Sequence, residues 1–127
     1  MSLLGAAEIR ELAVKLDLNP SKGLGQNFVI DGNTCQRIVR QVEISKDDVV
    51  LEIGPGLGSL SLAILETGAP LIAVEIDNRL AKQLPETVAL HNSVADLTVI
   101  NKDALEVTEL PKNPTVLVAN LPYNVSV

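Results

Sequence analysis

Four short apolar runs, each followed at once by glycine or polar residues, constrain the fold of this chain most strongly. The runs span residues 49–53, 71–74, 97–100 and 115–119, and helical patterns separate the first three. Strands that alternate with helices at this spacing form βαβ units, whose parallel sheet carries helices on both faces. The carboxyl ends of such strands meet along one edge, where ligands bind. We therefore predict an α/β fold with about four parallel strands and one ligand crevice.

The remaining segments divide the chain into two parts. Apolar residues recur at helical spacing over residues 6–18, and a break with one proline and two glycines follows at residues 19–25. An extended segment, 26–30, leads into a second helix that ends at residue 42. Further helices are predicted over 59–67 and from Asp77 to just before Pro85. We expect an N-terminal helical segment at 1–46 and a sheet domain at 47–127.

Composition excludes several classes of protein. The longest apolar stretches fall far short of the roughly 20 residues that span a bilayer, and no basic, apolar leader is present, so we expect a cytoplasmic protein without a membrane partner. Cys35 stands alone, which fits a reducing compartment. His91 is the only histidine, so we expect it to be a surface residue and not a metal ligand.

The net charge of the chain is −6, and the excess of acidic residues lies after residue 44. Any nucleic-acid contact is therefore expected in the N-terminal third or outside this chain.

The first apolar run leads into a glycine loop. Gly54, Gly56 and Gly58 stand between a strand and a helix, where the missing Cβ atoms allow a tight turn and close approach of a ligand. Ordinary turn glycines are the alternative, because the dinucleotide fingerprint needs glycine where this chain has Ser59. Glu75 directly follows the next run and can accept hydrogen bonds from both ribose hydroxyls of a nucleoside.

Polar groups follow the last two runs as well. Asp103 can accept a hydrogen bond from an adenine amine, or it can simply cap a short helix. After the fourth run, the Asn120 side chain and the Leu121 carbonyl offer two acceptors for an amine on an aromatic ring, while Tyr123 can stack on that ring. The alternative is that Asn120 is a turn residue and Tyr123 fills the core.

Five motifs together resemble those of one enzyme family. They are Leu24-Gly25-Gln26-Asn27-Phe28, Glu52-Ile53-Gly54-Pro55-Gly56-Leu57-Gly58, Val74-Glu75-Ile76-Asp77, Asp103-Ala104 and Asn120-Leu121-Pro122-Tyr123-Asn124. The chain resembles the S-adenosylmethionine-dependent ribosomal RNA adenine dimethyltransferases of the kasugamycin-sensitivity type, over residues 22–127. The resemblance implies a Rossmann-like class I methyltransferase sheet and dimethylation of the exocyclic amines of adjacent adenosines in small-subunit (16S) ribosomal RNA, a step of ribosome biogenesis.

The resemblance also implies residue roles. Cofactor contacts are expected for Asn27, Val29, Gly54, Glu75, Asp103 and Asn120, and catalytic roles for Asn120, Leu121 and Tyr123. S-adenosylmethionine is the implied cofactor, small-subunit ribosomal RNA is the implied partner, and no metal is required.

Two alternatives share parts of this pattern. The macrolide-resistance methyltransferases of the large subunit have the same plan but usually carry isoleucine after the asparagine, so Leu121 and Pro55 favour the small-subunit type. A noncatalytic or nicotinamide nucleotide-binding module is the other alternative, and Ser59 argues against it.

The chain is shorter than a complete methyltransferase domain. A seven-stranded methyltransferase sheet with its helices needs about 165 residues, and this chain has 127. We expect an N-terminal fragment, without the family's C-terminal helical domain, that binds cofactor but turns over poorly. Its last strand is then expected at an unprotected sheet edge that can pair with another chain.

Overall fold

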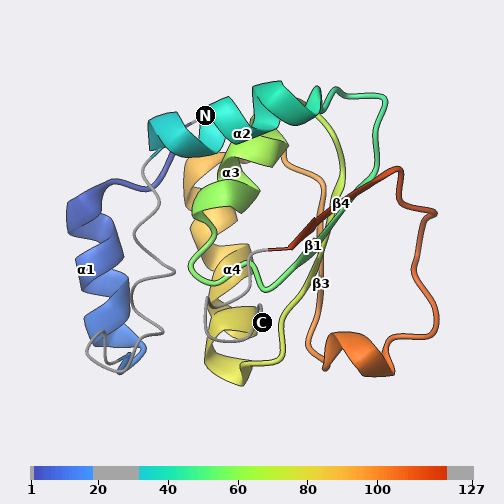
Figure 1. The fold of residues 1–127 in the computed structure, drawn as a ribbon. Coiled ribbons are helices and arrows are strands. Elements are labelled where there is room, and N and C mark those ends of the chain that lie inside the picture. Colours follow the sequence, from blue (N-terminus) through green and yellow to red (C-terminus); the bar gives the residue numbers. More distant parts are fainter. Residues whose placement is uncertain (1, 19–31, 120–127) are drawn as a thin grey trace, which may run out of the picture.

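A four-stranded parallel sheet forms the centre of the chain. The computed structural model describes residues 2–18 and 32–119. The strands are β1 (Val50–Ile53), β2 (Leu71–Val74), β3 (Leu97–Ile100) and β4 (Val116–Ala119), in the order β3-β2-β1-β4 (Figure 1). All three strand pairs are parallel. The predicted α/β fold with four parallel strands is therefore confirmed.

Strand order reverses at β1. The chain adds β2 and β3 on one side of β1 and then returns to place β4 on the other side. Ile53, the last residue of β1, pairs with Val74 of β2 and with Ala119 of β4, so these three strands end level with one another. In an open parallel sheet, this reversal opens the crevice in which ligands bind.

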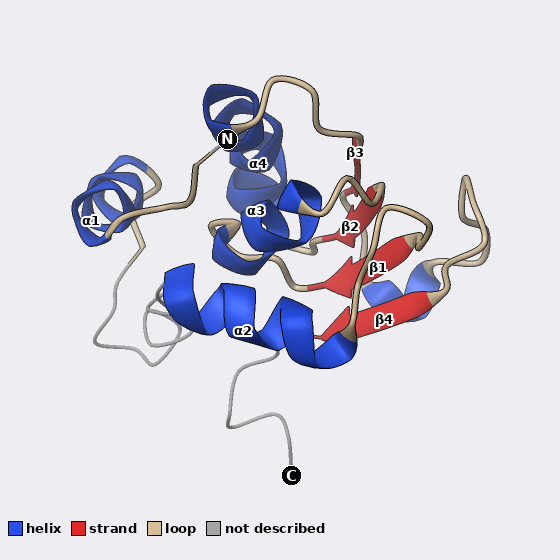
Figure 2. Ribbon diagram, turned by 90° about the horizontal axis from the view of Figure 1, so that it is seen from above, coloured by secondary structure: helices blue, strands red, loops and turns tan. Residues whose placement is uncertain are grey.

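Three helices pack on the same side of the sheet. They are α2 (Gly32–Val42), α3 (Ser59–Glu66) and α4 (Asn78–His91), and α1 (Ala6–Lys15) lies further out, beside α4 (Figure 2). Right-handed crossovers that step in one direction place their helices on one face, as α3 and α4 do.

Helices were predicted on both faces of the sheet, but in the described residues the second face is almost bare. The return from β3 to β4 carries only the short 3₁₀ helix η3 (Ala104–Glu106) on that side. Leu105 is 93% exposed and Leu117 of β4 is 67% exposed. Within the described residues, a three-residue helix is too short to cover this face. β4 also forms an edge of the described sheet, and pairing of that edge with a second copy stays a prediction.

Helix α4 is longer than predicted. Asp77 caps its start as expected, since Asp77 Oδ1 accepts hydrogen bonds from the backbone N–H groups of Arg79 (2.8 Å) and Leu80 (3.2 Å). The helix does not stop before Pro85 but continues to His91. Leu80, Leu84 and Val88 are buried at four-residue spacing. Of these three residues only Val88 follows Pro85. Its burial is worth about 1.5–3 kcal/mol, which is comparable to the cost of about 3 kcal/mol for an internal proline.

His91 is not the surface residue that the sequence predicted. Its side chain is 12% exposed and has partners at both ring nitrogens. Nδ1 lies 2.6 Å from Ser2 Oγ, and Nε2 lies 2.8 Å from a carboxylate oxygen of Glu8. These contacts join the start of α1 to the end of α4, two segments far apart in the sequence.

One carboxyl group lies inside an otherwise aliphatic core. Glu52 of β1 is fully buried, and the Ser61 hydroxyl of α3 donates a hydrogen bond of 2.5 Å to its Oε1. Its Oε2 has no hydrogen-bond partner among the described residues. Burial raises the pKa of Glu52 to about 7, the Ser61 hydrogen bond opposes that shift, and the nearby Glu75 carboxyl adds to it.

This raised pKa predicts a pH-dependent stability. The folded chain holds the Glu52 proton up to about pH 7, whereas the unfolded chain releases it near 4.5. The free energy of unfolding should therefore fall by up to about 3 kcal/mol as pH rises through this window. Glu52→Gln should remove this part of the decline, and Glu109→Gln at an exposed position should retain it. Urea titrations at several pH values measure the slopes, and parallel slopes for Glu52→Gln and the unmodified chain would contradict the account.

Gly58 provides a second test of the fold. It caps α3 with φ +101°, and an added Cβ would lie 2.7 Å from Cδ1 of the buried Leu84. A left-handed backbone costs an L-residue about 1–2 kcal/mol before any clash is counted. Gly58→Ala should lower the free energy of unfolding by at least that amount. Gly5→Ala, at a position with open space around it, is the matched control and should change stability by less than about 1 kcal/mol. Equal losses in the two variants would count against this role of Gly58.

Candidate functional site

The glycine loop lies at the carboxyl end of β1, where strand order reverses. Gly54, Gly56 and Gly58 all have positive φ angles, of 73°, 61° and 101°. The Gly54 N–H donates to the Val74 carbonyl (2.9 Å), which fixes the start of the loop against the end of β2. L side chains rarely adopt this backbone, so glycine is required here for conformation as well as for space. The loop then enters α3 at Ser59, whose buried Oγ has no partner among the described residues.

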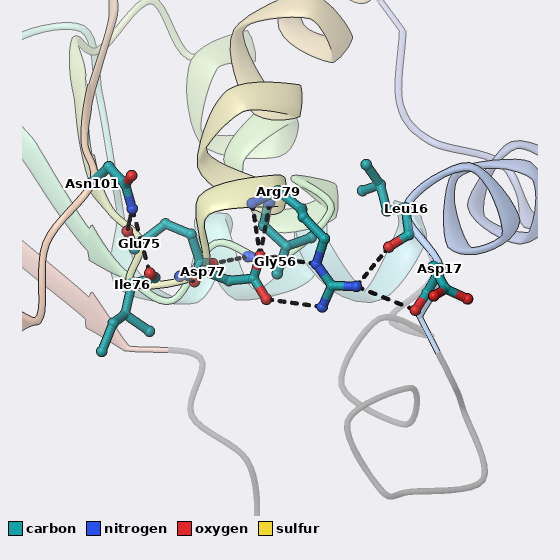
Figure 3. Close-up of polar contacts among 9 residues, drawn as sticks. Leu16, Asp17, Gly56, Glu75, Ile76, Asp77, Arg79 and Asn101 are labelled. Atoms are coloured by element: carbon teal, nitrogen blue, oxygen red, sulfur yellow. Dashed lines mark hydrogen bonds and ion pairs between the residues drawn. The ribbon is translucent and has the colours of Figure 1, made fainter.

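Glu75 lies directly beside this loop. The residue is 6% exposed, and its two carboxylate oxygens accept backbone hydrogen bonds from Gly56 (3.2 Å) and Asp77 (3.0 Å) (Figure 3). Burial raises the pKa of Glu75, and the hydrogen bonds from the two N–H groups oppose that shift. The structure thus brings together two features, the glycine loop and Glu75, that the sequence placed at the ends of neighbouring strands.

Asn101 supports Glu75 from β3. Its side-chain Nδ2 donates to the backbone carbonyls of Glu75 (2.9 Å) and Ile76 (3.4 Å), as Figure 3 shows. Asn101 was not among the site residues predicted from the sequence. Its position immediately after the third apolar run was the available signal, since Glu75 stands in the same position after the second run.

Asp103 caps a short helix, which was the second of the two roles predicted for it. Its Oδ1 accepts a hydrogen bond from the Leu105 N–H (3.0 Å) and so caps η3. The other carboxylate oxygen retains its acceptor capacity, because a carboxylate offers about four lone-pair sites. The cap therefore leaves room for a ligand contact.

Arg79 connects the site to α1. Its guanidinium donates to the backbone carbonyls of Leu16 (2.7 Å) and Asp17 (3.2 Å) and pairs with the Asp77 carboxylate (3.1 Å) (Figure 3). These bonds satisfy carbonyls at the end of α1, where Asp17 adopts a positive φ of 56°. No local sequence signal identified this contact, because Leu16 and Arg79 are 63 residues apart.

The other predicted site residues lie outside the described residues. These are Asn27, Val29, Asn120, Leu121 and Tyr123. Of the predicted set, the structure describes Gly54, Glu75 and Asp103, and it joins Glu75 to the loop that begins at Gly54.

Within 2–18 and 32–119, no three His, Cys, Asp or Glu side chains are grouped so that they could hold a metal ion. None of the helices in the described part is long and apolar enough to cross a membrane.

Sequence comparisons identify relatives over the whole chain. The family model for ribosomal RNA adenine dimethylase matches residues 18–127. The chain is 59% identical to "Ribosomal RNA small subunit methyltransferase A" of Leifsonia xyli over 129 residues, covering 100% of this chain and 46% of that protein. It is 56% identical to the protein of the same name from Mycobacterium tuberculosis, covering 98% of this chain and 41% of that protein. The chain thus spans less than half the length of these curated relatives.

Solved structures share the fold. A dimethyladenosine transferase from Plasmodium falciparum matches with a TM-score of 0.62 and 28% identity, over 76% of this chain and 34% of that one. The 23S rRNA methyltransferase ErmE matches with a TM-score of 0.62 and 34% identity, over 76% of this chain and 38% of that one. These likenesses confirm the Rossmann-like methyltransferase fold. Together with the family match over residues 18–127, they show that the chain belongs to the ribosomal RNA adenine dimethylase family.

Proposed function

We propose that this chain is the S-adenosylmethionine-binding part of an enzyme that dimethylates adjacent adenosines in small-subunit ribosomal RNA. Curated relatives named as small-subunit methyltransferases are 53–59% identical to it, against 34% for the large-subunit enzyme ErmE. This difference favours the small-subunit type over the macrolide-resistance type. The family membership favours a methyltransferase over a nicotinamide-binding module.

The hydrogen bond between Gly56 and Glu75 is the observation that carries the proposal. It places a buried carboxylate beside a glycine loop at the point where strand order reverses. Each oxygen of Glu75 accepts one backbone N–H and retains a further lone pair, so the carboxylate can accept two more hydrogen bonds. The two hydroxyls of a ribose supply that pair of donors.

The loop residues fit the rest of such a cofactor. Gly54 and Gly56 carry no side chain, so a ligand can approach the backbone closely. When bound, S-adenosylmethionine supplies a methyl group activated by its positively charged sulfur. The chain binds and orients, and orientation is worth up to about 7–11 kcal/mol in well-aligned reactions. We assign the methionine part to Gly54, the ribose to Glu75 and the adenine amine to the second oxygen of Asp103.

The remaining assignments concern residues outside the described part. Asn27 and Val29 are proposed to hold the cofactor from the N-terminal side. Asn120 and Leu121 are proposed to accept the two N–H bonds of the target amine while Tyr123 stacks on the base. The target adenine must leave its stack to reach them, at a cost of a few kcal/mol that is smaller in a loop than in a duplex.

The proposed partner is ribosomal RNA, and the proposed location is the cytoplasm. The net charge of −6, with its acidic excess after residue 44, favours RNA contacts through the N-terminal third or through parts beyond this chain.

Substitution of Glu75 tests the proposed function. Glu75→Ala removes two charge-assisted hydrogen bonds to the ribose, so affinity for S-adenosylmethionine should fall by roughly 100-fold. Glu109→Ala, at an exposed position, should bind as the unmodified chain does. Isothermal titration calorimetry measures both, with NAD as the competing ligand and circular dichroism as a check on folding. Unchanged affinity in a folded Glu75→Ala chain, or a preference for NAD, would contradict the proposal.

A further inference from the structure

The Asn101 side chain continues the pairing of β2 with β3 beyond the ends of both strands. Val74 and Ile100 pair as the last residues of the two strands, and the Glu75 N–H donates to the Ile100 carbonyl (3.0 Å). Beyond this bond, Asn101 Nδ2 donates to the carbonyls of Glu75 (2.9 Å) and Ile76 (3.4 Å). A side chain thus supplies the donor that the main chain of a longer β3 would provide.

The surroundings of the Asn101 amide group fix its orientation. The group faces two carbonyl oxygens, so its Nδ2 points toward them, because its own oxygen would be repelled. The two carbonyls belong to consecutive peptide units, one between Glu75 and Ile76 and the next between Ile76 and Asp77 (Figure 3). One side chain therefore holds two peptide planes at once.

These two peptide units carry N–H groups that act on the Glu75 carboxylate. The described residues contain no cis peptide bond, and in a planar trans peptide the N–H points opposite to the C=O. With both carbonyls turned to Asn101, the N–H groups of Ile76 and Asp77 point the other way. The Asp77 N–H donates to Glu75 Oε2 (3.0 Å). Burial raises the pKa of Glu75, and the N–H groups of Asp77 and Ile76 are among those that oppose this shift.

We propose that Asn101 is a positioning residue that sets the preference of this site for ribose over 2′-deoxyribose. This inference rests on the proposed function, in which the Glu75 carboxylate accepts a hydrogen bond from each ribose hydroxyl. Asn101 acts through the two peptide units and not on the ligand. It holds the carboxylate in one orientation before binding, so that both hydroxyls find an acceptor without a cost for ordering the side chain.

The position of Asn101 makes a clean test possible. Its side chain is exposed, so Asn101→Ala leaves the core intact, and circular dichroism checks that the variant folds. Calorimetric titrations with S-adenosylhomocysteine and with its 2′-deoxy analogue measure the preference. The unmodified chain should bind the ribose ligand about ten-fold more tightly, because the deoxy ligand lacks one charge-assisted hydrogen bond. In Asn101→Ala, this preference should fall below about three-fold.

A second substitution at the same position separates donor from shape. Asn101→Asp has nearly the same shape but presents only acceptors to the two carbonyls, so it should lose the preference at least as fully as Asn101→Ala. Asn113→Ala and Asn113→Asp, at an exposed position, are the matched controls and should keep the ten-fold preference. Amide hydrogen exchange without ligand should be faster at Asp77 in Asn101→Ala and unchanged at Glu75, whose N–H is bonded to Ile100.

A double-mutant cycle assigns the effect to the Glu75 carboxylate. Once Glu75→Ala has removed that carboxylate, Asn101 has nothing left to position. Adding Asn101→Ala to Glu75→Ala should then change the affinity for S-adenosylhomocysteine by less than about two-fold.

The possible failures are distinguishable. A preference that survives in folded Asn101→Ala would overturn the inference while leaving the proposed function intact. Equal losses for the two ligands would do the same, because they would show a general structural role, and so would a full loss in the Glu75→Ala background. Absence of a ribose preference in the unmodified chain, or its survival in Glu75→Ala, would overturn the proposed role of Glu75, and the inference with it.

Discussion

The hydrogen bond from the Gly56 N–H to Glu75 Oε1 unites the candidate site, and it depends on strand register. Ile53 pairs with Val74, and the next residue along β1, Gly54, donates its N–H to the Val74 carbonyl. The glycine loop and Glu75 thus leave neighbouring strands at the same level. A slip of one residue would turn every side chain of β2 to the opposite face of the sheet. The buried faces of β1 and β2 prevent such a slip, so core packing sets the geometry of the site.

Burial then gives that geometry its electrostatic character. Glu52 lies near the carboxyl end of β1, and Glu75 directly follows β2 at the same edge of the sheet. Burial raises the pKa of each carboxyl group. Stability alone would favour apolar residues at such positions, because unpaired buried carboxyls weaken a fold. Carboxyl groups with raised pKa values in a crevice are typical of functional sites. The two groups differ in their partners, since backbone N–H groups hold Glu75 in place whereas Glu52 has one hydroxyl.

Local patterns in the sequence predicted the strands, the glycine loop and the position of Glu75. Each follows from short-range rules, namely apolar runs, backbone freedom at glycine and the level ends of parallel strands. The contacts of His91 and Arg79 were not predictable in this way, because they join α1 to α4 across more than 60 residues. The continuation of α4 past Pro85 and the exposed face around Leu117 likewise depend on tertiary packing. The orphaned oxygen of Glu52 emerges only when α3 is packed onto β1.

A crystal structure of the chain with S-adenosylhomocysteine would test the central claim most directly. The account predicts both ribose hydroxyls within hydrogen-bond distance of the Glu75 carboxylate, with the backbone bonds from Gly56 and Asp77 retained. It also predicts that the ligand crosses the glycine loop at Gly54. A ligand bound away from the ends of β1 and β2, or a Glu75 side chain that turns away from the ribose, would contradict the account.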